Sequence, residues 1–307
     1  MASAVFKTVA RPHERSRVGS TPMHSRQQAR CQVSGFSAEE PSERVIAEFG
    51  GGGQPVRLAG GQGETFRAGD VVLKRSGLEA EAEWTATLFD RIAGPGFRVP
   101  RPRRSHDGRF VVHGWCAWEY VAAEHAGPNG GRWAETIAVC RAFHAALANE
   151  PRPAFLDSRS DAWAEADRLT FGERIESPLA PVAEAIGRLQ RLLRPVAAPS
   201  QLVHGDFTAN VLFAEGEQPC VIDFSPYWRP APFALGVVVA DAVAWAAADP
   251  SIANLCADVP AFGQWLARGA LRRLWELDQH ARRGRAVPEA SIRAYAPVVA
   301  LAERLAG

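Results

Sequence analysis

Four polar side chains in one short stretch have the types and spacing that could carry out chemistry. The stretch covers residues 201–225 and reads QLVHGDFTANVLFAEGEQPCVIDFS. Its two apolar runs, VLFA and CVIDF, flank the polar turn EGEQ and predict a β-hairpin. His204, Asp206 and Asn210 precede the first predicted strand, and Asp223 lies in the second run. A buried hairpin has no structural need for two carboxylates, so these residues are candidates for a functional site.

A fifth candidate is a lysine. The chain contains 33 arginines but only two lysines, Lys7 and Lys74. Lys74 follows the predicted strand VVL, and a compact ammonium group is not interchangeable with a guanidinium where a point charge enters a narrow site. The alternative is that a surface lysine has survived there by chance.

A glycine-rich turn precedes Lys74. The segment RLAGGQGETFRAGDVVLKR predicts three strands joined by two turns, with Gly61 and Gly63 in the first turn. Such a turn lets backbone N–H groups approach phosphate oxygens. The pattern is not the GxxxxGK[ST] phosphate loop. A lysine on the following strand is instead the arrangement of kinases, in which that lysine contacts the phosphates of the nucleotide.

A helix is predicted directly after Lys74, in LEAEAEWTATLFDRIAG. Its apolar residues recur at i, i+4 and i+8 from Trp84 and form one face. Glu81 lies at the edge of that face and is a candidate ion-pair partner for Lys74, whereas Glu79 and Glu83 are expected to face solvent. A surface helix with three exposed glutamates is the alternative.

The remaining pattern divides the chain into two halves. The strands RFVVHGW and AWEYV, after the turn HDG, complete a predicted five-stranded antiparallel sheet. The segments RWAETIAVCRAFHAALA, VAEAIGRLQRLL and FGQWLARGALRRLWELDQHA predict amphipathic helices. The segment AWEYVAA joins the halves, and its backbone at Glu119 and Val121 is a candidate contact for an adenine. The most apolar stretch, APFALGVVVADAVAWAAA, is interrupted by Asp241 and predicts a buried helix rather than a membrane span.

Composition excludes several classes of protein. The 307 residues exceed the usual size of a single core, which favours two lobes. A net charge of +1 gives no reason to expect nucleic acid or a membrane surface as a partner. The five cysteines are scattered and form no CxxC pair, so we expect reduced thiols and a cytoplasmic protein.

The first 45 residues differ from the rest. They are rich in Arg, Ser and Gln and have no apolar periodicity, which predicts a disordered basic extension. A basic binding tail, a transit-like leader and a mis-assigned start codon are the alternatives for this segment. No apolar region typical of a secretory signal is present. The first apolar pattern, RVIAEFG from Arg44, predicts a short strand or helix that caps the sheet.

The motifs HGDFTAN (204–210) and VIDFS (221–225) together resemble the protein-kinase-like superfamily, and more narrowly the aminoglycoside phosphotransferase and choline kinase type of small-molecule kinase. The resemblance covers residues 46–307. It implies an α+β, bilobal protein-kinase-like fold, with a nucleotide-binding N-lobe at 46–122, made of a five-stranded antiparallel sheet plus one helix. A mainly helical C-lobe at 123–307 would carry the catalytic loop and the acceptor site.

The resemblance also implies roles for the candidates. Asp206 would be the catalytic aspartate that takes or orients the proton of an acceptor hydroxyl, while Asn210 and Asp223 would bind Mg²⁺. His204 would brace the loop. The phosphates of ATP would lie against Lys74, which Glu81 would hold. The partner is then a small hydroxylated molecule; neither its identity nor the oligomeric state follows from the sequence.

Three features depart from the family pattern. Asn210 follows Asp206 by four residues instead of the usual five. DFS stands where protein kinases have DFG, and the family's GDPxxD spacing is missing after it. Asp241 is either a remnant of that motif, bracing the catalytic loop, or an aspartate on a helix face. A degenerate kinase-like protein that binds nucleotide or a partner without catalysis is therefore an alternative, and a metal hydrolase built on His204, Asp206 and Asp223 is a further one that lacks additional His ligands.

Overall fold

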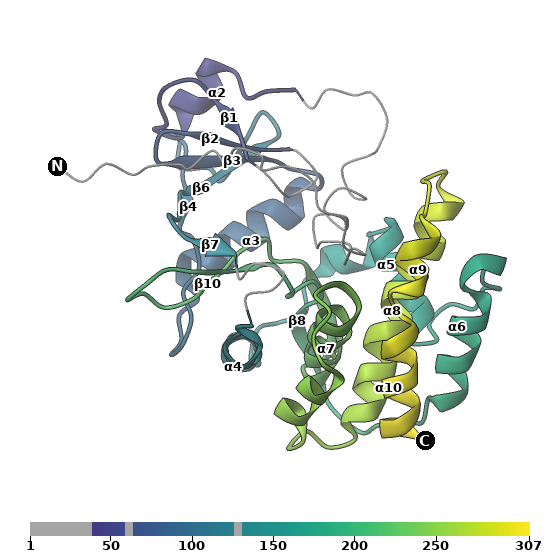
Figure 1. Cartoon of the computed structure of the whole chain (residues 1–307). Helices are drawn as coiled ribbons and strands as arrows, with labels where there is room; N and C mark the ends of the chain where they lie inside the picture. Colours follow the sequence, from purple (N-terminus) through teal and green to yellow (C-terminus); the bar gives the residue numbers. More distant parts are fainter. Residues whose placement is uncertain (1–38, 59–63, 126–130) are drawn as a thin grey trace, which may run out of the picture.

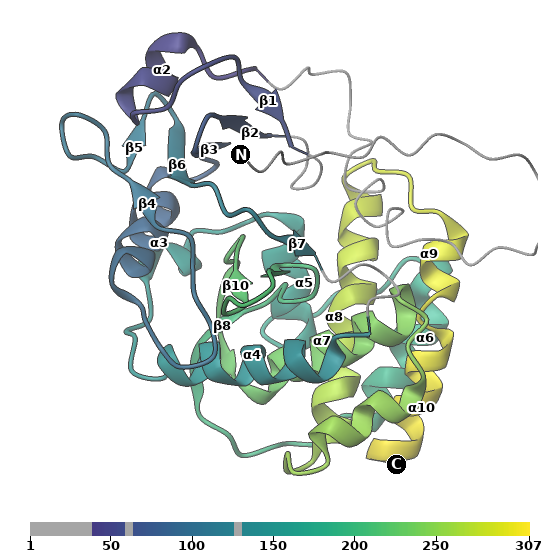
Figure 2. The same cartoon turned by 60° about the vertical axis from the view of Figure 1, so that its left-hand side comes forward.

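The chain folds into a sheet-containing lobe and a helical lobe (Figures 1 and 2). The structure, a computed structural model, describes residues 39–58, 64–125 and 131–307. The predicted glycines Gly61 and Gly63 lie outside the described residues, as does almost all of the predicted N-terminal extension.

An antiparallel sheet forms the first lobe, in the strand order β1-β2-β3-β6-β4 with β5 paired to β6. Its strands are β1 (Val56–Arg57), β2 (Thr65–Ala68), β3 (Val71–Arg75), β4 (Pro102–Arg103), β5 (Val111–Val112) and β6 (Trp115–Glu119). The antiparallel sheet predicted from the sequence is confirmed, with one strand more than the five expected. The additional strand, β4, has only two residues and begins with a proline, which is tolerated at a sheet edge and gives no alternating pattern.

A short helix, α2 (Glu43–Glu48), covers one face of this sheet. Ser42 caps the helix by accepting a hydrogen bond from the backbone of Val45 (3.4 Å). Val45, Ile46 and Phe49 are buried in one cluster with apolar side chains of β2, β3, β5 and β6. The predicted cap on the sheet is therefore confirmed. Helix α2 begins at Glu43, before the boundary expected at residue 45, and already buries Val45.

The second lobe contains the helices that the amphipathic segments predicted, together with shorter ones. Its elements are α4 (Trp133–Ala146), η2 (Ala154–Asp157), α5 (Ala162–Thr170), α6 (Ala180–Leu192), α7 (Pro232–Trp245), η3 (Pro250–Cys256), α8 (Phe262–Arg282), α9 (Glu289–Arg293) and α10 (Ala296–Ala306). Every residue of α7 from Phe233 to Val243 is buried, as expected for a core helix. None of the helices in the described part of the chain combines the length and apolarity that crossing a membrane requires.

The candidate residues lie between the lobes, around short strands. β8 (Ser200–His204) pairs with β11 (Pro226–Pro230), and β9 (Val211–Phe213) pairs with both β10 (Cys220–Val221) and β7 (Glu124–His125). The β9–β10 hairpin is the one predicted from VLFA and CVIDF. Helix α3 (Glu79–Arg91) follows β3 in the chain and packs against the helical lobe. Its Leu88 and Phe89 belong to the main hydrophobic core.

Helices α7 and α8 cross with their backbones in direct contact. A Cβ atom on Gly236 would lie 2.2 Å from the carbonyl oxygen of Trp265, and one on Gly269 would lie 2.5 Å from the carbonyl carbon of Gly236. Only glycine allows such an approach. About one turn beyond this crossing on each helix lie Asp241 and Arg273, which the crossing therefore brings together.

Candidate active site

His204 holds the catalytic loop through three hydrogen bonds. Its Nδ1 accepts from the backbone N–H groups of Asp206 (3.2 Å) and Ser225 (3.4 Å), and its Nε2 donates to the carbonyl oxygen of Ile222 (3.2 Å). The side chain is fully buried, and burial lowers its pKa to about 4. A neutral imidazole with its proton on Nε2 satisfies all three contacts, and this is the geometry expected of a bracing residue.

The loop from Asp206 to Asn210 is closed by its own side chain. Asn210 Nδ2 donates to the carbonyl oxygen of Asp206 at 2.6 Å, and Asn210 N donates to the carbonyl oxygen of Phe207 at 3.1 Å. Ala209 has a left-handed backbone, with φ of 63°. An alanine in this region is strained, as expected where four residues span a turn that usually has five. The shortened loop thus still brings Asn210 back to Asp206.

Asp223 and Lys74 meet across the two lobes. Lys74 on β3 places its Nζ 2.6 Å from Asp223 Oδ1. Burial opposes ionisation of Asp223, but the Lys74 ammonium outweighs it and holds the pKa of this carboxyl below its usual value. Each side chain is 35% exposed, so the pair opens onto solvent between the lobes. Asp223 has a φ of 51°, a further strained position at the site.

Aromatic packing fixes the backbone next to Asp223. The ring of Phe224 lies 5.8 Å from Phe89 of α3, 5.5 Å from Phe143 of α4 and 5.4 Å from His204, measured between ring centroids. Phe224 therefore joins α3, α4 and the catalytic loop. These contacts fix the backbone that follows Asp223.

His144 is a contributor that sequence reasoning missed. It lies on α4, donates from Nδ1 to the carbonyl oxygen of Cys140 (2.6 Å) and accepts at Nε2 from the backbone N–H of His204 (3.0 Å). Burial lowers its pKa to about 4. Nothing in the pattern of α4 distinguishes this histidine from a core residue, because its partner is 60 residues away.

The glutamates of α3 differ from expectation. Glu83 is not solvated as expected: its Oε1 accepts the backbone N–H of Val111 at 2.9 Å and ties α3 to β5. Glu81 lies within electrostatic reach of Lys74 and forms a 4.0 Å ion pair with Arg159. Burial raises the pKa of Glu81, against the opposing charge of Arg159. The expected partner of Glu81, Lys74, is itself paired with Asp223 in this state.

The segment between the lobes uses part of its backbone internally. Glu119 N donates to the carbonyl oxygen of Arg101 (2.8 Å), and the carbonyl oxygen of Val121 accepts from Ala123 N (3.0 Å). Hydrogen bonds to an adenine would therefore involve the carbonyl oxygen of Glu119 and the N–H of Val121.

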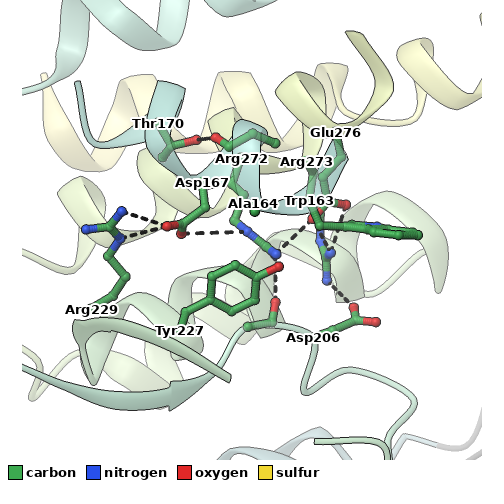
Figure 3. A network of polar contacts seen from close by, with 12 residues as sticks. Trp163, Ala164, Asp167, Thr170, Asp206, Tyr227, Arg229, Arg272, Arg273 and Glu276 are labelled. Atoms are coloured by element: carbon green, nitrogen blue, oxygen red, sulfur yellow. Dashed lines mark hydrogen bonds and ion pairs between the residues drawn. The ribbon is translucent and has the colours of Figure 1, made fainter. Parts of the chain in front are cut away.

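Asp241 contacts the catalytic loop indirectly, through Arg273. It is fully buried on α7 and binds the guanidinium of Arg273, with contacts of 3.1 Å to Nε and 2.7 Å to Nη2. Arg273 Nη2 in turn donates to Asp206 Oδ1 at 2.6 Å (Figure 3). Asp241 therefore reaches the loop through an arginine that the motif search did not identify.

A cavity of about 210 Å³ is lined by residues of η2, α5, β11 and the segments next to them, and by none of residues 204–210. Tyr227 of β11 forms one wall and packs against Gly205, where a Cβ atom would lie 2.4 Å from the tyrosine ring. The lining is mostly charged: Arg152, Arg159, Arg168, Arg229, Asp157, Asp167 and Glu173, with Trp228 beside them. Trp265 and Trp275 do not line this cavity and are buried in the core.

The donors present fit a magnesium ion bound together with phosphates. Asn210 uses its amide nitrogen within the loop, so its amide oxygen is the atom that it can offer to a cation. Asp223 stays ionised and partly exposed. Mg²⁺ typically takes one or two protein oxygen ligands and completes its shell with phosphates and water. No group of three or more His, Cys, Asp or Glu that could hold a metal by itself occurs among the described residues.

Comparison with protein-family models decides the classification. A model described as the phosphotransferase enzyme family matches residues 56–227, more than half of the chain. The chain belongs to this family. The matched segment of this phosphotransferase runs from β1 to Tyr227 and includes Lys74, the catalytic loop and Asp223. The resemblance seen in the motifs is thereby confirmed, and the protein is a kinase-type phosphotransferase.

Solved structures confirm the fold of this phosphotransferase. An aminoglycoside phosphotransferase from Alicyclobacillus acidocaldarius is 16% identical with a TM-score of 0.56, covering 88% of this chain and 95% of that one. A choline/ethanolamine kinase family protein from Mesorhizobium loti is 18% identical with a TM-score of 0.53, covering 92% and 94%. A spectinomycin phosphotransferase solved with ADP and spectinomycin is 14% identical with a TM-score of 0.51, covering 85% and 96%. A search of curated protein sequences found no match.

Proposed function

We propose that the protein is an ATP- and magnesium-dependent kinase that transfers the γ-phosphoryl group to a hydroxyl of a small molecule. The observation that carries the proposal is the meeting of Lys74 from one lobe with Asp223 from the other, beside the Asp206–Asn210 loop. The two opposite charges lie 2.6 Å apart. Lys74, supported by Glu81, would contact the phosphates of a bound nucleotide, and Asp223 would bind the cation that accompanies them.

The residues divide the reaction between them. The acceptor oxygen attacks the γ-phosphorus, the bond from that phosphorus to the β-bridging oxygen breaks, and ADP leaves with the electron pair. Asp206 orients the acceptor hydroxyl and receives its proton. Asp223 and the amide oxygen of Asn210 would hold Mg²⁺, which would supply charge neutralisation on the phosphates. His204 fixes the backbone at Asp206 relative to the backbone at Ile222 and Ser225, on either side of Asp223.

The cavity beside Tyr227 supports a polar acceptor. Its guanidinium and carboxylate groups are already paired with one another, as in Arg229 with Asp167 (2.7 Å) and Arg152 with Asp157 (2.9 Å). A lining of both charge signs suits a small, hydroxylated, uncharged or zwitterionic molecule better than a strongly cationic one. Hygromycin B and spectinomycin, the compounds bound in related phosphotransferase structures, are the reference acceptors for a screen.

Two substitutions test the assignment of roles. Asp223→Ala should remove magnesium-dependent nucleotide binding. Asp206→Ala should leave binding within about threefold and lower turnover by at least 100-fold, because it acts on the acceptor. Calorimetry with Mg·ATP and a coupled ADP-release assay against a panel of hydroxylated compounds measure the two effects. If both folded variants lose nucleotide binding equally, the roles are misassigned. Nucleotide binding without transfer to any acceptor would favour the degenerate alternative.

A further inference from the structure

Two consecutive arginines of α8 hold two consecutive residues of the catalytic loop (Figure 3). Arg272 Nη1 donates to the carbonyl oxygen of Gly205 at 2.7 Å, and Arg273 Nη2 donates to Asp206 Oδ1 at 2.6 Å. Each arginine is 1% exposed. One arginine thus fixes the backbone of the loop, and the other fixes the carboxylate itself.

The two guanidinium groups are not held equally. All three nitrogens of Arg273 are bonded: Nε and Nη2 to Asp241 (3.1 and 2.7 Å), Nη1 to both oxygens of Glu276 (2.9 and 3.0 Å), and Nη2 also to Asp206. Arg272 Nε has no hydrogen-bond partner within the described ranges. Arg273 is therefore fixed by two carboxylates that belong to helices and presents its remaining contact to the loop.

The charge of Arg273 is permanent. Burial alone would lower its pKa, but Asp241, Glu276 and Asp206 together raise it well above its usual value. Stabilisation of the fold does not explain such a group, because a buried ion-pair network contributes little compared with apolar residues of the same volume. The arrangement differs from a purely structural network in one respect: one of its carboxylates, Asp206, is the residue that the reaction requires.

We propose that Arg273 is a positioning residue for phosphoryl transfer: Asp241 and Glu276 fix its guanidinium, and the guanidinium sets the orientation in which Asp206 meets the acceptor hydroxyl. The inference rests on the proposed role of Asp206. Because the transition state of phosphoryl transfer is loose, the protein contributes mainly through placement, and an error of about 1 Å can cost about 100-fold in rate. Asp241 contributes indirectly, by fixing the guanidinium of Arg273.

The test uses a charge-matched double variant. Arg273→Met combined with Asp241→Asn removes one positive and one negative charge, and Glu276 keeps Arg272 as its partner (2.9 Å). The control is Arg282→Met with Asp278→Asn, a pair at 2.6 Å on the same helix. Its other contacts lie away from the loop and are made to Glu176, Ser177, Leu179 and Gln279. Arg273→Lys keeps the cation but loses the planar fork.

Turnover is measured as ADP release, with the best acceptor of the panel and with water alone, and nucleotide affinity is measured by calorimetry with Mg·ATP. We expect the Arg273→Met/Asp241→Asn variant to bind Mg·ATP within about twofold of wild type and to turn over about 100-fold more slowly. The Arg273→Lys variant should recover part of the rate. The control pair should stay within about threefold of wild type.

A double-mutant cycle separates positioning from a structural effect. In an Asp206→Asn background the same change at Arg273 and Asp241 should cost less than about threefold, because the effect passes through the carboxylate that is already absent. Equal losses in both backgrounds, retained turnover in the charge-matched variant, or Arg273 variants that all fail to fold would overturn the inference. Failure of the proposed function is distinct: the wild-type chain would then bind no nucleotide or transfer no phosphoryl group, and Asp206 would have no reaction for Arg273 to serve.

Discussion

Replacing Lys74 by alanine should remove about half to nine-tenths of the stabilisation of the protein by Mg·ATP. Without nucleotide, the substitution removes the ion pair with Asp223, whose partners are each 35% exposed. A pair as exposed as this contributes about 0–1 kcal/mol. The ligand-free melting temperature should therefore change by no more than about 4 °C.

The effect with nucleotide is larger. At 100 times its Kd, Mg·ATP stabilises the wild-type native state by about 2.7 kcal/mol, which for a chain of this size raises Tm by roughly 5–10 °C. A hydrogen bond between charged groups contributes about 1.5–3 kcal/mol, so losing Lys74 weakens binding by about 10- to 150-fold. At the same nucleotide concentration the remaining stabilisation is then about 0.3–1.4 kcal/mol.

Thermal melting with and without millimolar Mg·ATP measures the difference. Arg75→Ala is the matched control, because Arg75 follows Lys74 on β3 but pairs with Glu39 (3.2 Å) and lies over the ring of Trp115 (5.3 Å). Its increase in Tm with nucleotide should equal that of wild type. An increase in the Lys74→Ala variant that matches wild type would refute the placement of the phosphates beside Lys74.

Two further predictions follow from the structure. The pKa of His144 is lowered by burial from 6.5 to about 4, so the unfolded chain binds the additional proton. His144 alone should therefore lower the free energy of unfolding by about 3 kcal/mol as the pH falls from 6.5 to 4. Urea titrations of wild type and His144→Gln across this range should show a weaker pH dependence in the variant; identical slopes would contradict the assignment. A chain beginning at Ser42 keeps the cap on Val45 N and loses the exposed Glu39–Arg75 pair. It should melt within about 2 °C of the full chain and bind Mg·ATP equally, and precipitation of the truncated chain would show that the segment before Ser42 packs on the lobes.

The sequence was sufficient where chemistry and local pattern coincide. The hairpin and α3 follow from the pattern of apolar residues, and the buried helix α7 follows from a continuous apolar run. The motif spacing placed His204, Asp206, Asn210 and Asp223 around one loop. Lys74 could be identified because the chain otherwise uses arginine so consistently. These predictions depend on contacts within a few residues or on a motif whose order along the chain is fixed.

What the sequence could not show are contacts between distant helices. Arg273 reaches Asp206 across 67 residues and His144 reaches His204 across 60, and each looks like an ordinary residue of an amphipathic or apolar helix. Glu83 was misassigned for a related reason. Helical periodicity places it off the apolar face but cannot show that the N–H of Val111 lies within its reach.

The shortened loop shows how the helical lobe compensates for a change near the reaction. In this loop, which is one residue shorter, Ala209 has a strained left-handed backbone. The orientation of Asp206 then depends more on contacts from outside the loop. Two hydrogen bonds hold Asp206. Asn210 donates to its backbone carbonyl oxygen at 2.6 Å, and Arg273 donates to its carboxylate at 2.6 Å. The second bond exists because α7 and α8 touch at Gly236 and Gly269, which brings Asp241 against Arg273. The loss of the GDPxxD spacing after Asp223 is then understandable, because Asp241 can support the loop from the helix through an arginine instead of from a fixed position in the motif.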